Sequence, residues 1–246
     1  MDDTPAFWSL ARQAEAIRAR RVSIPEVVEA QLGRIATLNA RYRAFSYLDE
    51  AGALAAARRL QAELEADRAR GPLHGITVSV KGSLPVAGLP WTEGSALYRD
   101  RVAGTDAELV DRARRAGGVV LGTTTLSELA MYAPDNPAEP LGLNPWDEAR
   151  TSGGSSTGAG VAAVLGMAVV NVGTDAGGSI RNPACHCGAV GFMASPDRLP
   201  LGGSPSYAPS VGTAGLIGRE VDDVRVAFEV LRAGPAAPAP VAQRRL

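Results

Sequence analysis

The sequence lacks several features that mark specialised classes of protein. Two cysteines in 246 residues cannot form a disulfide framework, and no C-x-x-C pair indicates structural zinc. The 25 basic residues are balanced by 26 acidic ones, so no basic field favours nucleic acid or an anionic membrane. We therefore predict no metal, no cofactor, and neither a nucleic-acid nor a membrane partner.

A targeting or membrane-spanning segment is also missing from the pattern. The chain starts MDDTPAFW, which is acidic where a signal peptide needs a basic start followed by an apolar run. The longest apolar stretch, residues 159–170, is too short and too rich in glycine to span a bilayer. These features predict a soluble, cytoplasmic protein, and the length suits one globular domain.

Lysine is almost absent. Of the 25 basic residues one is lysine, Lys81, and the other 24 are arginine. A coding bias toward arginine accounts for this count, and so does chemistry, because a buried lysine can lose its proton whereas arginine cannot. A position that needs a neutral amine as a general base could not be given to arginine.

Residues 1–70 are predicted to form a helical region of the same domain. Phe7, Leu10, Ala14 and Ile17 recur at helical spacing. The segment from Ser23 to Glu26 has the pattern of a capping box with proline in the first turn. Residues 51–70 are rich in strong helix formers.

Residues 71–234 are predicted to form the core of the domain. Short apolar runs typical of strands alternate with helical patterns, which is characteristic of an α/β sheet. The long stretch 133–154 has no periodicity and is predicted to be an ordered loop. The tail, residues 235–246, is rich in proline and alanine and has no core of its own. The predicted strands span 76–80, 118–121 and 168–172, and the predicted helices span 105–116, 125–132 and 157–167.

Two glycine-rich segments, 151–158 and 174–183, combine hydroxyl groups with flexible backbone. Glycine lets the chain turn sharply and aim N–H groups at one point, while serine adds a nucleophile or a donor. The first segment is not a phosphate-binding loop, because no lysine follows it.

Two other interpretations of these segments compete. Residues 154–158 match G-x-S-x-G, which makes an esterase using Ser156 and His186 an alternative, although that motif requires a strand before the serine and a loop is predicted here. Cys185, His186 and Cys187 do not have the spacing of a zinc site, and a turn with a satisfied histidine explains them better.

Taken together, three separated motifs resemble the amidase signature family. They are the strand ending in Lys81, the GGSS sequence at 153–156 and GTDAGGSIR at 173–181, and residues 144–147 (NPWD) also resemble the loop of that family. The resemblance covers most of residues 5–230. It implies an α/β fold with a mixed β-sheet core flanked by helices, N-terminal helices, and hydrolysis of a small-molecule amide through an acyl-enzyme.

The resemblance also implies roles for individual residues. Ser179 would be the nucleophile, Ser155 the bridging serine after a cis Gly154–Ser155 bond, and Lys81 the neutral base. Met131 would line the acyl pocket. The backbone N–H groups of the oxyanion hole would come from Ala176, Gly177, Gly178 and Ser179, and the residues that brace the site would be Ser156, Thr174, Asp175 and Arg181.

The chain departs from the family pattern in several places. Thr157 stands where the family usually has glycine, Gly82 follows the lysine where an acidic residue is usual, and the stretch after the nucleophile appears only as residues 192–198. Members typically run to nearly twice this length. A naturally short amidase, a half-site completed by a homodimer or a partner chain over an exposed sheet edge, and an inactive relative therefore remain open.

Overall fold

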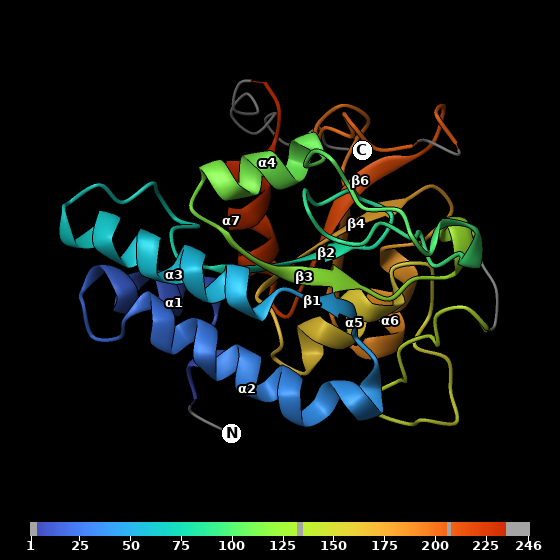
Figure 1. Cartoon of the computed structure of the whole chain (residues 1–246), viewed down its shortest axis with the longest axis horizontal. Helices are drawn as coiled ribbons and strands as arrows, with labels where there is room; N and C mark the ends of the chain where they lie inside the picture. Colours follow the sequence, from blue (N-terminus) through green and yellow to red (C-terminus); the bar gives the residue numbers. More distant parts are fainter. Residues whose placement is uncertain (1–3, 132–134, 206–207, 235–246) are drawn as a thin grey trace, which may run out of the picture.

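A six-stranded mixed sheet covered by helices on both faces forms the centre of the molecule (Figure 1). The computed structural model describes residues 4–131, 135–205 and 208–234. The strand order is β1-β3-β2-β4-β6-β5. The predicted α/β class with a mixed sheet is confirmed.

The three central strands are parallel and the outer ones are not. β2 pairs in parallel with β3 and with β4, whereas β1 is antiparallel to β3, β6 to β4 and β5 to β6. Every residue of β2 and β3 is buried, as expected for strands with helices on both faces. The strands are β1 (Phe45–Leu48), β2 (Thr77–Lys81), β3 (Val119–Thr124), β4 (Val170–Asp175), β5 (Val190–Met193) and β6 (Thr213–Gly218).

The helices divide between the two faces of this sheet. In Figure 1, α4 and α7 lie on one side, and α5 and α6 on the other. None of the helices in the described ranges combines the length and the apolar character needed to cross a bilayer. The helices are α1 (Leu10–Arg18), α2 (Ile24–Tyr42), α3 (Glu50–Glu65), α4 (Glu108–Arg115), α5 (Thr157–Val164), α6 (Arg181–Cys187) and α7 (Val221–Leu231), with 3-10 turns at Pro5–Phe7, Ala96–Tyr98 and Glu128–Ala130.

The predicted start of α2 is confirmed in atomic detail. The Ser23 hydroxyl accepts the Glu26 N–H, and the Glu26 carboxylate accepts the Ser23 N–H at 2.7 Å. The prediction that residues 1–70 are wholly helical was wrong, because this region also contributes β1. That strand has only four residues, and its pairing with β3 is a tertiary contact that no local pattern reveals.

The helix predicted over 125–132 was also wrong. The described part of this segment holds only the 3-10 turn Glu128–Ala130, in which Leu129 and Ala130 have φ angles of 52° and 56°. An α-helix cannot contain such residues. Instead, the Thr125 N–H donates to Ala44 and its hydroxyl to Arg43, so this residue continues the contacts of the sheet edge.

The long loop is confirmed over the residues that the structure covers. Residues 135–154 carry no helix or strand, apart from one isolated bridge between Leu143 and Thr151. The predicted tail, residues 235–246, lies outside the described residues, as do 132–134. The division into regions 1–70 and 71–234 stays a prediction, since the sheet draws strands from both.

Close packing of α5 against the sheet depends on a residue without a side chain. The Gly158 N–H donates to Thr125 at 3.0 Å, and a Cβ at Gly158 would lie 2.0 Å from the Ala44 carbonyl oxygen. The backbone of α5 therefore touches the chain that enters β1. The glycine-rich segment leads directly into this helix, so its position is set by the same contact.

We expect Gly158→Ala to lower the free energy of unfolding by about 1–3 kcal/mol or more, because the added methyl group has no room. Gly33→Ala is the matched control. Gly33 also lies inside a helix, but nothing lies within 4 Å of its Cβ position. That change should raise stability by about 0.5–1 kcal/mol. Urea unfolding measures both, and equal effects would contradict the packing argument.

Candidate active site

The amine of Lys81 is the centre of the site. Lys81 ends β2, and the neighbouring parallel strand β4 ends at Thr174 and Asp175, so the two strands deliver these side chains to the same edge of the sheet. The Lys81 Nζ lies 2.7 Å from Ser155 Oγ, 3.0 Å from Thr174 Oγ1 and 3.3 Å from the Thr174 carbonyl oxygen.

Burial changes the chemistry of this amine. Lys81 and Ser155 both have no solvent exposure. Removal from water lowers the pKa of Lys81 from 10.5 to about 7, and the charge of Asp175 opposes this shift only in part. A neutral amine is therefore available near neutral pH beside the Ser155 hydroxyl.

The two glycine-rich segments meet at one cleft. The Gly154–Ser155 bond is cis, as predicted. The Ser156 N–H donates to the Ser179 carbonyl oxygen at 3.0 Å, which ties the segments together. Ser155 and Ser179 both line a cleft of about 510 Å³. Among the contacts of the described residues there is no hydrogen bond between their two hydroxyl groups.

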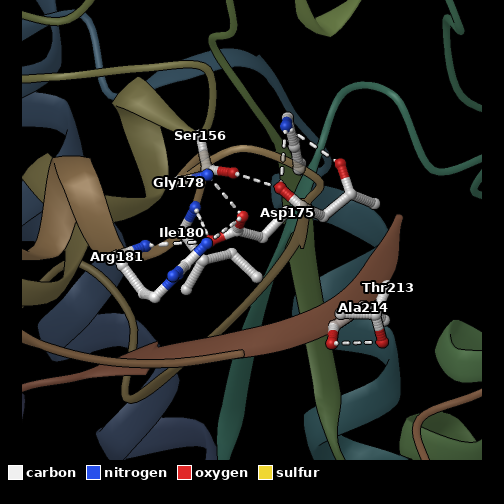
Figure 2. Close-up of polar contacts among 9 residues, drawn as sticks. Ser156, Asp175, Gly178, Ile180, Arg181, Thr213 and Ala214 are labelled. Atoms are coloured by element: carbon white, nitrogen blue, oxygen red, sulfur yellow. Dashed lines mark hydrogen bonds and ion pairs between the residues drawn. The ribbon is translucent and has the colours of Figure 1, made fainter. Parts of the chain in front are cut away.

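Asp175 braces the turn that carries Ser179. Figure 2 shows its carboxylate enclosed by the N–H groups of Gly178, Ile180 and Arg181 and by the Arg181 guanidinium, with donor distances of 2.6–3.3 Å. Burial alone would raise the pKa of Asp175, but the Arg181 ion pair and these N–H donors outweigh it and lower the pKa to about 2. Asp175 is thus a fixed anion.

The same contacts alter the predicted oxyanion hole. The Gly178 N–H is already bound to Asp175 Oδ1 at 2.6 Å, which reduces the predicted donor set to the remaining residues of the turn. Ala176, Gly177 and Ser179 line the cleft. Gly178 instead helps to hold the turn in place.

The other bracing residues have local partners. The buried Ser156 hydroxyl donates to the Thr174 carbonyl oxygen at 3.4 Å, and the Thr157 hydroxyl donates to Gly153 at 3.1 Å. The His186 ring contacts the Thr151 carbonyl oxygen. In the described chain no contact joins Ser156 to His186, and no group of three or more potential metal ligands occurs there.

The wall of the cleft contains residues that the sequence did not single out. Met131 lies in this wall, as the resemblance implied, together with Leu84, Leu129, Leu201 and Val211. These residues come from loops that lie far apart in the chain. They carry no local motif, so only the tertiary structure brings them to attention.

The comparison with protein families decides the relationship. The family model described as Amidase matches residues 26–236. The chain belongs to the amidase family. A crystallised amidase with 35% sequence identity superposes with a TM-score of 0.85, covering 91% of this chain and 51% of that protein.

Relatives within the amidase family are about twice as long as this chain. It is 39% identical to a subunit of the glutamyl-tRNA(Gln) amidotransferase of Acidothermus cellulolyticus over 85% of its own length and 42% of the relative. The peptide amidase of Stenotrophomonas maltophilia shares 31% identity and a TM-score of 0.89, covering 94% of this chain and 49% of that enzyme. The chain thus spans about half the length of the proteins that it matches.

Replacement of Asp175 by Asn tests the brace. Its pKa is 3.8 in the unfolded chain and about 2 when folded. The ionised group therefore stabilises the fold above pH 3.8, by about 2 kcal/mol, and this contribution is lost as the pH falls toward 2. Asp175→Asn should lower the free energy of unfolding by at least that amount at pH 7, and by less below pH 3.8.

Asp222→Asn serves as the control, because Asp222 pairs with Arg225 in an exposed ion pair. Its loss should change stability by less than about 0.5 kcal/mol at either pH. Urea unfolding between pH 3 and pH 7 measures both variants. A constant penalty for Asp175→Asn across this range would contradict the assignment of Asp175 as a stabilising anion.

Proposed function

We propose that this amidase-family chain hydrolyses a carboxylic amide to the acid and ammonia or an amine, through an acyl-enzyme on Ser179. The observation that carries the proposal is the fully buried Lys81 amine 2.7 Å from the Ser155 hydroxyl, beside a cleft that Ser179 shares. A neutral amine in contact with a serine is the arrangement needed to activate a hydroxyl nucleophile.

Acylation proceeds through a proton relay. Ser179 Oγ attacks the amide carbonyl carbon and passes its proton to Ser155 Oγ, whose own proton moves to the Lys81 amine. The C–N bond of the tetrahedral intermediate then breaks, and the leaving nitrogen takes up the proton returned through Ser155. Water attacks the acyl-enzyme by the reverse use of the relay and releases the acid.

The turn after β4 stabilises the charge that develops on the substrate oxygen. The N–H groups of Ala176, Gly177 and Ser179 are the candidate donors, each worth about 3–4 kcal/mol in the barrier if aligned. Asp175 and Arg181 act indirectly, because their ion pair and the Gly178 contact hold this turn in shape. Thr174 helps to orient the Lys81 amine.

Covalent labelling with a fluorophosphonate and peptide mapping tests the nucleophile. We expect an adduct on Ser179. Lys81→Met and Ser155→Ala should each slow labelling by about 100- to 10,000-fold, since each removes a member of the proton relay. Ser127→Ala is the control, because the Ser127 hydroxyl is buried without a partner and lies outside the cleft. An adduct on Ser156 would support the esterase alternative instead.

The rate of labelling should depend on pH through Lys81. The neutral form of the amine is the base, and the pKa is lowered to about 7. The rate should therefore rise from pH 5, reach half of its maximum near pH 7 and level off above about pH 8. A rate that continues to rise toward about pH 10 would show that burial does not lower the Lys81 pKa.

A partner-dependent chain is the second candidate function. The chain spans about half of its relatives, and one of them is named as part of an amidotransferase. A homodimer or a partner chain would then complete the site. In that case the isolated chain fails to label Ser179, and labelling appears when the partner is added.

A further inference from the structure

The surface of the cleft is apolar near its mouth. Met131 and Val211 are 65% and 53% exposed, although large apolar side chains are usually covered. Both line the cleft, together with Leu84, Leu129, Ala130 and Leu201. Exposed apolar groups gathered at one cleft are typical of a binding surface.

The charges near this surface are already engaged. In the part of the cleft that the structure describes, Asp175 is the one charged lining residue. Its side chain has no solvent exposure, and its two oxygens together accept the N–H and guanidinium donors of the turn. The polar lining residues that remain, such as Ser83, Asn182 and Thr213, are uncharged.

A charged substrate would therefore lose water without gaining a partner. Transfer of an unpaired carboxylate or ammonium out of water is far more costly than transfer of an alkyl group, which gains from burial. The cleft thus favours one substrate class by what its wall offers and excludes others by the ion pair that it cannot form.

We propose that the cleft selects uncharged amides with an apolar acyl group, and that Val211 is a residue that determines this specificity. This inference rests on the proposed function and names its substrate class. The acyl chain packs against the wall formed by Leu84, Leu201 and Val211, with its carbonyl group at Ser179.

Three amides of similar length test the proposal. Hexanamide is neutral, the monoamide of adipic acid ends in a carboxylate, and 6-aminohexanamide ends in an ammonium group. We expect kcat/KM for hexanamide to exceed that of either charged amide by at least about 100-fold. Equal values, or a preference for a charged amide, would overturn the proposal.

Val211→Arg supplies the missing charge. Val211 is exposed, so the longer side chain can be accommodated without repacking the core. The ratio of kcat/KM for the carboxylate amide to that for hexanamide should rise by about 10-fold, and the ratio for the ammonium amide should fall. Val211→Gln, which adds length without charge, should produce neither opposite shift.

Val102→Arg controls for a change in overall charge. Val102 is also exposed, at 59%, but lies outside the cleft, so its ratios should match those of the original chain. Equal shifts in Val102→Arg and Val211→Arg would overturn the role of Val211.

Fluorophosphonate labelling separates the two levels of proposal. Labelled Ser179 with no preference among the amides overturns the substrate class alone. If no amide is turned over but Ser179 is labelled, an alkyl fluorophosphonate must react faster than one that carries a carboxylate, and equal rates overturn the substrate class. Absence of both turnover and labelling, with or without a partner, overturns the proposed function and this inference with it.

Discussion

The burial of the Lys81 amine is the constraint on which the rest of the site depends. A cationic amine excluded from water is costly unless a carboxylate pairs with it. The hydrogen-bond partners of Nζ are Ser155 and Thr174, both of which are uncharged. The neutral amine is favoured as a result, and its lowered pKa is a direct consequence of the packing around the end of β2.

The packing that buries this amine comes from parallel strands and a helix of small residues. β2 and β4 end side by side, which places Lys81 next to Thr174. α5 approaches the sheet closely because Gly158 has no side chain to hold it away. The segment before α5 then brings Ser155 onto the amine. One close backbone contact and one strand pairing thus determine the distance that matters for chemistry.

The electrostatics of the turn after β4 separate two tasks. Asp175 is ionised, but its charge is used up by Arg181 and by backbone N–H groups. It stabilises the turn without offering a charge to a ligand. Because the Gly178 N–H belongs to this brace, the turn holds its shape with one donor and leaves its neighbours facing the cleft. The neutral, apolar wall of the cleft follows from the same arrangement.

Local patterns in the sequence determined the features that neighbouring residues control. The capping box at Ser23 and the buried strand ending in Lys81 are of this kind, because short-range hydrogen bonds and side-chain periodicity reveal them. The roles expected of Ser155 and Ser179 came from the resemblance of three motifs. The strand β1, the positive-φ turn after β3 and the apolar wall around Val211 were decided by the tertiary structure alone. Each depends on contacts between segments far apart in the chain, and such contacts leave no periodic trace in the sequence.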